Sequence, residues 1–99
     1  MVRHIVLWNL KETLSESERR TAAARIKTAL EALPEEIPGI VSLTVHADMV
    51  GGNRDLALDS VFESEEALRA YVDHPAHVRV ATEIVRPATQ DRASADYHV

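Results

Sequence analysis

The chain has no cysteine, few aromatic residues and no long apolar stretch. The lack of cysteine excludes disulfides, thiolate nucleophiles and cysteine-ligated metals. No apolar run approaches the roughly 18 residues that a membrane-spanning helix needs. The first twelve residues, MVRHIVLWNLKE, also lack the apolar core of a secretion signal. We therefore expect a soluble, cytoplasmic protein with no membrane partner.

Positive charge is also scarce. The chain carries 11 Lys and Arg against 16 Asp and Glu, which gives a net charge of −5, and its basic residues are scattered. Because binding to nucleic acid depends on clustered positive charge, we expect no nucleic-acid partner. The Gly51-Gly52 pair lacks the following Lys-Ser/Thr of a phosphate-binding loop.

Large apolar side chains are few as well. Apolar residues make up 45% of the chain, but 14 of them are alanines and aromatics account for only 4%. The length favours one domain over residues 1–99. A domain of this size buries only roughly 60–70% of its unfolded surface. Association with a second copy would therefore add stability.

Local patterns divide the chain into strands and helices. Residues 2–10 are apolar on both faces, as in a strand that is covered on both sides. Ser15 followed by Glu18 forms a capping box that begins a helix, and Pro34 ends that helix. We predict a strand over 2–10, a helix over 15–33, strands over 40–50 and 55–63, helices over 64–72 and 75–86, and a last strand over 91–98.

Two strands carry more specific expectations. In the segment 40–50, Val41, Leu43 and Val45 alternate with polar residues and should face the core. On the opposite face, His46 and Asp48 should be solvated. In the third strand, Asp59 should pair with an arginine of this chain or of a partner subunit, because an unpaired buried carboxylate costs several kcal/mol.

The element order β-α-β-β-α-α-β predicts an α+β fold of the ferredoxin-like type. In this fold the helices cover one face of a four-stranded antiparallel sheet, and here the second helix is broken in two. The uncovered face is also apolar in residues 2–10. Because exposed apolar patches usually mark interfaces, we predict a homodimer in which two sheets face each other.

A phenol and two imidazoles lie close together in the segment Tyr71-Val72-Asp73-His74-Pro75-Ala76-His77. Pro75 breaks the helix here, and the bend can turn Tyr71 and His77 toward one pocket. Enol-forming reactions need a base near neutral pH and a donor to the developing oxyanion. We assign His77 as the base and Tyr71 as the hydrogen-bond donor or acid.

The first strand and the C-terminus add candidates to this site. His4 alternates in register with Val6 and Trp8 and should point into the same apolar pocket. Asp96 could orient one histidine by accepting its second N–H. We therefore predict His4 as a third catalytic residue, and a substrate-binding set formed by Val6, Trp8, His74 and Asp96.

Structural roles for the same residues remain open. His74 and His77 could cap the broken helix, His74 being the better candidate. Tyr71 and His4 could be core residues with satisfied polar atoms. Asp96 could be a hydrogen-bond acceptor at a strand edge or in the dimer. His4, His74, His77 and Asp96 could supply a two-His-one-carboxylate metal set, but the spacing matches no metal motif, and we expect neither metal nor cofactor.

The chain resembles the Dabb family, the stress-responsive α/β-barrel domain, over nearly its whole length. The matching residues are His4-Ile5-Val6-Leu7, Ile37-Pro38-Gly39-Ile40, Asp55-Leu56-Ala57-Leu58, Phe62-Glu63-Ser64, Glu66-Ala67-Leu68, Tyr71 with His74-Pro75-Ala76-His77-Val78, Asp91-Arg92 and Asp96-Tyr97. The resemblance implies a dimeric α+β barrel with a pocket between sheet and helices in each subunit. In polyketide cyclases of the olivetolic acid cyclase type, a Tyr and a His that act together match Tyr71 and His77. A pocket His matches His4, and an Asp near the C-terminus matches Asp96.

Three functions are compatible with these observations. The first is a cofactor-free cyclase or lyase that acts on a small apolar or aromatic, carbonyl-bearing, polyketide-like substrate through Tyr71 and His77. The second is a non-catalytic stress-responsive or ligand-binding dimer. The third is a cofactor-free monooxygenase.

Overall fold

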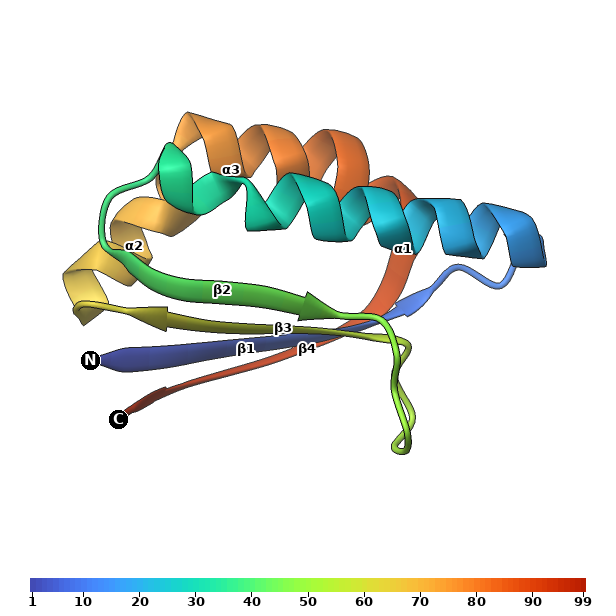
Figure 1. Ribbon diagram of the computed structural model, residues 1–99, viewed down its shortest axis with the longest axis horizontal. Coiled ribbons are helices and arrows are strands. Elements are labelled where there is room, and N and C mark those ends of the chain that lie inside the picture. Colours follow the sequence, from blue (N-terminus) through green and yellow to red (C-terminus); the bar gives the residue numbers. More distant parts are fainter.

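A computed structural model describes residues 1–99. Its regular elements are β1 (Val2–Leu10), α1 (Glu16–Glu31), η1 (Leu33–Glu35), β2 (Ile40–His46), β3 (Leu56–Phe62), α2 (Glu65–Asp73), α3 (Pro75–Val80), η2 (Ala81–Val85), η3 (Arg86–Ala88) and β4 (Thr89–His98). The four strands form one antiparallel sheet in the order β2-β3-β1-β4. All helices lie on one face of this sheet (Figure 1). The predicted ferredoxin-like α+β fold is thus confirmed.

Strict alternation along β1 builds the core beneath the helices. Val2, His4, Val6, Trp8 and Leu10 are buried, whereas the residues between them are only partly buried. The buried set faces α1 and the broken second helix, because the pleat sends alternate side chains to opposite faces. The core cluster is completed by Ile26, Leu30, Leu33, Ile37, Leu43, Val45, Leu56, Leu58, Phe62, Leu68, Tyr71 and Val85.

The helices begin where the sequence patterns place them. The predicted capping box is present: the Ser15 hydroxyl accepts from the Glu18 amide, and the Glu18 carboxylate accepts from the Ser15 amide. At the break in the second helix, α3 begins at Pro75 and continues into a π-helical turn, η2. Single π turns inside helices are frequent at functional sites, and this one packs against α1.

Two predictions for the second strand differ from the structure. Strand β2 ends at His46, four residues early, because its partner β3 begins only at Leu56 and later residues have no ladder to join. Val41 is 52% exposed, against the prediction that it faces the core. A register shift between Ile40 and Ser42 causes this difference, since an extra residue changes which face a side chain takes. The predictions for Leu43, Val45, His46 and Asp48 are confirmed.

Gly39, which precedes β2, meets two requirements at once. Its φ of 91° lies in the left-handed region, which side chains rarely adopt. A Cβ atom here would lie 2.7 Å from the Cβ of Ala67. The absence of a side chain therefore lets α2 dock against the start of β2, which places the helix that carries Tyr71.

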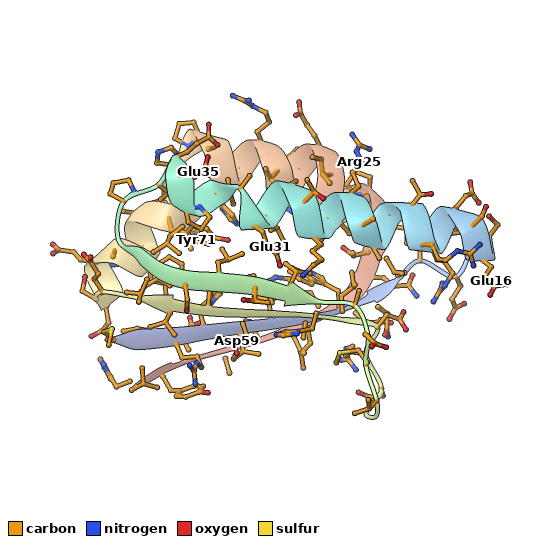
Figure 2. All side chains as sticks on the ribbon, in the orientation of Figure 1. Glu16, Arg25, Glu31, Glu35, Asp59 and Tyr71 are labelled. Atoms are coloured by element: carbon orange, nitrogen blue, oxygen red, sulfur yellow. The ribbon has the colours of Figure 1, made fainter.

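The sheet face opposite the helices is uncovered within the chain. Figure 2 shows Asp59 on this face and Tyr71 on the helix side. Asp59 Oδ1 lies 3.2 Å from Arg3 Nε, so the predicted pairing with an arginine is confirmed, within the chain itself. Ile5 and Leu7 of β1 share this face and are only partly buried. None of the helices combines the length and the apolar character that crossing a membrane requires.

Candidate functional site

A cavity of about 290 Å³ lies between the sheet and the helices. Residues of three strands and of both parts of the broken second helix contribute to its wall. Most of its wall is apolar, and its polar groups are two imidazoles, one phenol and two guanidiniums. The lining residues are His4, Val6, Trp8, Leu30, Leu58, Tyr71, Val72, His77, Ala81, Val85, Arg86 and Arg92.

Tyr71 lies at the inner end of this arrangement. Its side chain is 1% exposed, and its ring centroid is 4.3 Å from that of His77 and 4.9 Å from that of Phe62. Burial raises the pKa of Tyr71 to about 12, against a smaller lowering effect of the Arg92 charge. The phenol is therefore protonated at physiological pH and can donate a hydrogen bond. Its buried hydroxyl has no partner in the protein, which is costly unless a ligand or water supplies one.

His77 is held as a neutral base. Its Nδ1 lies 3.1 Å from the Val72 carbonyl oxygen, at the end of α2. A carbonyl only accepts, so Nδ1 carries the proton and the Nε2 lone pair remains free. Burial lowers the pKa of His77 more than the hydrogen bond to the Val72 carbonyl raises it, and the charges of Arg86 and Arg92 add to the lowering. The ring is thus unprotonated at neutral pH and able to take a proton.

His4 is oriented by the adjacent strand. The register of β1 and β4 places His4 opposite Asp96, and His4 Nδ1 lies 2.5 Å from Asp96 Oδ1. The carboxylate accepts a hydrogen bond from Nδ1–H, which fixes the tautomer of His4. The Nε2 lone pair is then available to a molecule in the cavity. The His4 and Tyr71 ring centroids are 6.3 Å apart. Asp96 itself does not line the cavity, so it reaches the site through His4.

His74 lies at the break in the second helix. It is the N-cap of α3, and its Nδ1 accepts a hydrogen bond from the Ala76 amide at 3.1 Å. It is absent from the cavity wall. His74 thus has the capping position that the sequence also indicated for it. The structure brings five of the predicted residues together: His4, Val6, Trp8, Tyr71 and His77 line one cavity, and Asp96 contacts His4 from outside its wall.

The sequence reasoning missed Arg86 and Arg92. Arg92 shares an alternating set with Ser94 and Asp96 on β4, so strand periodicity could have placed it on the helix side. Arg86 follows the π turn η2 and opens the 3₁₀ turn η3. No periodic pattern marks such a junction, so its position could be known only from the folded chain.

Residues 2–99 match the family model described as the Stress responsive A/B Barrel Domain, Dabb. The chain belongs to this family. The resemblance inferred from the motifs is thus confirmed. A curated relative, a stress-response A/B barrel domain-containing protein of Arabidopsis thaliana, is 31% identical over 97 residues. That match takes in 98% of this Dabb chain but only 36% of the relative's length.

Solved structures agree on the fold. A dimeric protein of unknown function with a ferredoxin-like fold, from Bacteroides fragilis, is 33% identical, with a TM-score of 0.89 and coverage of 99% and 95% of the two chains. A hydroxynitrile lyase from Passiflora edulis is 22% identical, with a TM-score of 0.81 and coverage of 99% and 92%. The second likeness is one of fold alone.

This Dabb chain has a second, larger hollow of about 470 Å³ beside the loop between β2 and β3. Its charged groups are already partnered: Arg19 Nη2 lies 3.1 Å from Asp55 Oδ2, and Arg54 Nε donates to the Asp91 carbonyl at 2.8 Å. It contains no histidine or tyrosine. No cluster of three or more His, Asp or Glu side chains in the chain could hold a metal ion. The smaller cavity is therefore the candidate site.

Proposed function

We propose that this Dabb protein is a cofactor-independent enzyme of the lyase or cyclase type, acting on a small carbonyl compound with an apolar or aromatic body. The observation that carries the proposal is the buried Tyr71 hydroxyl, which has no partner, on a ring whose centroid lies 4.3 Å from that of neutral His77. A base and an uncommitted donor facing one apolar cavity are what enolate formation requires.

The proposed chemistry uses only side chains of this chain. His77 Nε2 takes a proton from the carbon next to the carbonyl, and the C–H electron pair forms a carbon–carbon double bond. The carbonyl oxygen becomes an enolate oxygen, which accepts a hydrogen bond from Tyr71. The enolate carbon then attacks a second carbonyl of the same molecule, whose π bond breaks as the carbon–carbon bond forms, and the resulting alkoxide takes the proton back from His77. Without a second carbonyl, the enolate carbon itself reclaims that proton. His4, held by Asp96, offers Nε2 to a neighbouring hydroxyl group.

The fold is compatible with such chemistry. The Passiflora edulis relative is by its name a lyase, although its identity to this chain is only 22%. Fold likeness alone does not transfer a substrate. Support for the proposal therefore comes from the cavity residues.

Proton abstraction can be tested without knowledge of the natural substrate. The protein would be incubated in D₂O with two aryl ketones, 4-oxo-4-phenylbutanoate and its neutral primary amide. Proton NMR would follow deuterium exchange at the carbon next to the ketone. Protein-dependent exchange of either compound supports the enzyme. Binding of both compounds without exchange would favour a ligand-binding protein and overturn the proposal for this substrate class.

The pH profile of this exchange is a second prediction. Only unprotonated His77 can act, and its pKa lies below the ordinary value of 6.5. We expect kcat/KM to be constant at neutral pH and to fall as the pH drops through a midpoint below 6.5. The pKa of Tyr71, about 12, predicts no alkaline loss from the phenol near pH 9. A midpoint above 6.5 would contradict a desolvated His77 as the base.

We also propose that the protein is a homodimer through the uncovered sheet face. The Bacteroides fragilis relative is described as dimeric, and the uncovered face carries Ile5 and Leu7 of β1 between polar neighbours. We expect sedimentation equilibrium at micromolar concentration to give twice the 11.0 kDa mass of one chain. A single-chain mass would contradict the dimer.

A further inference from the structure

The cavity holds two positive charges that the proposed proton transfer does not use. Arg86 and Arg92 both line it, together with His4 and His77, and no Asp or Glu side chain is part of its wall. The chain as a whole carries a net charge of −5. An acid-free cavity with two guanidiniums therefore stands out from the rest of the molecule and would attract a negatively charged ligand.

Neither arginine is committed to a partner in the protein. Arg3, Arg19 and Arg20 each lie within 4.0 Å of a carboxylate, but Arg86 and Arg92 form no ion pair. The single hydrogen bond of Arg92 is a long one of 3.4 Å to the Ser94 hydroxyl, and the Arg86 side chain makes none. Both residues line the cavity and are exposed to solvent. Their donors are free to hold a ligand.

Local structure places both charges near the reacting groups. Arg86 follows the π turn η2, whose Ala81 and Val85 form part of the same wall. Arg92 lies beside a β-bulge: Leu7 pairs with Ala93 and Asn9 with Gln90, so Asp91 and Arg92 together oppose Trp8. Asp91 has a φ of 55°, in the left-handed region. Bulges of this kind are over-represented next to active sites, where they redirect a strand.

The charges of the two arginines affect the pKa values of the proposed reacting groups. The pKa of Tyr71 is raised mainly by burial, but the Arg92 charge acts in the opposite direction. The lowered pKa of His77 likewise includes contributions from both arginines after that of burial. A bound anion at the arginines would thus lie within electrostatic reach of both His77 and Tyr71.

The rest of the cavity wall indicates the size and polarity of the uncharged part of the ligand. Eight of the twelve lining residues are hydrophobic, and the volume of about 290 Å³ is small. The planar fork of a guanidinium matches carboxylate oxygens with two parallel hydrogen bonds. A short apolar or aromatic group joined to one carboxylate fits both the apolar wall and the two guanidiniums.

We propose that the cavity selects substrates that carry a carboxylate, which Arg86 and Arg92 bind while the apolar part packs on Val6, Trp8 and Leu58. The inference extends the proposed function, because it assumes the same cavity and places the carbonyl near Tyr71 and His77. Its binding component does not depend on turnover. Arg86 and Arg92 are then specificity-determining residues for the reaction.

The test uses Trp8, the single tryptophan of the chain, which lines the cavity. Its fluorescence would be titrated with 4-oxo-4-phenylbutanoate, with the neutral primary amide and with phenyl phosphate. We expect the carboxylate to bind about 10- to 100-fold more tightly than the amide, the range expected for hydrogen bonds to a charged group. Arg86→Gln and Arg92→Gln should each remove about tenfold or more of this preference.

Matched variants separate site charge from net charge. Arg79→Gln on α3 makes the same charge change at an exposed residue outside the cavity wall and should leave the preference unchanged. Arg92→Lys should restore part of the affinity lost in Arg92→Gln, since the charge returns without the planar fork. Circular dichroism of each variant would show that the fold is retained.

Three outcomes would overturn the inference: equal affinity for acid and amide, no response to the acid, or tighter binding of phenyl phosphate than of the carboxylate. Failure of the proposed function looks different. Arginine-dependent binding of the acid without deuterium exchange would refute catalysis and leave anion selection standing. Exchange of the neutral amide that Arg86→Gln and Arg92→Gln do not alter, with no preference for the acid, would refute anion selection alone.

Discussion

Replacing His77 with alanine should reduce deuterium exchange by about 100- to 10,000-fold in kcat, the usual contribution of a positioned general base. The variant removes the Nε2 lone pair that faces the cavity. It also removes the hydrogen bond to the Val72 carbonyl, which costs about 1 kcal/mol of stability. The exchange rate of 4-oxo-4-phenylbutanoate, measured alongside a thermal melt, separates the two effects.

His46→Ala is the matched control for this experiment. His46 is exposed at the end of β2 and lies outside the cavity, so its loss should change neither exchange nor stability appreciably. If His77→Ala kept exchange within a few-fold of the unaltered protein, His77 would not be the base. His4 would then be the next residue to test, because its Nε2 faces the same cavity.

Replacing Tyr71 with phenylalanine should move stability and activity in opposite directions. The buried Tyr71 hydroxyl has no partner, so its removal should stabilise the fold by about 1–3 kcal/mol. For a domain of this size, each kcal/mol raises Tm by roughly 4–8 °C. The same change removes the donor to the enolate oxygen, which should lower kcat by about 100- to 1,000-fold. Calorimetry and the exchange assay would measure both effects.

Tyr97→Phe is the control, because Tyr97 is 49% exposed and lies outside the cavity. It should leave both quantities nearly unchanged. Two outcomes would contradict the role of Tyr71. A lower Tm in Tyr71→Phe would mean that the hydroxyl contributes to the core, and unchanged exchange would mean that it does not hold the oxyanion. A more stable but less active variant is the signature of a group kept for function.

The candidate site shows how far residue patterns reach. The alternation of His4, Val6 and Trp8 placed these side chains on one face correctly, because the two-residue period of a strand is a local property. The prediction that Asp96 orients a histidine agrees with the His4–Asp96 hydrogen bond. For His74, the sequence allowed both a cap and a ligand contact, and only the direction of the α3 N-terminus resolved the two.

Other features were outside the reach of local patterns. The bulge in β2 that exposes Val41 depends on how β2 pairs with β3. The π turn that precedes Arg86, and the bulge beside Arg92, depend in the same way on packing against distant segments. Periodicity assumes an unbroken repeat, so it fails at the positions where tertiary contacts interrupt that repeat.

The sequence by itself determined the order of elements, the inner face of β1, the capped start of α1, the break at Pro75 and the family. The structural features among these depend on residues a few positions apart, whose spacing and caps act locally, and the family follows from short motifs along the chain. Tertiary structure alone decided that the Tyr71 hydroxyl is buried without a partner and that Arg86 and Arg92 share a cavity without an acid. Burial and pairing are set by groups far apart in the chain, and they become defined only when the sheet and helices close around the cavity.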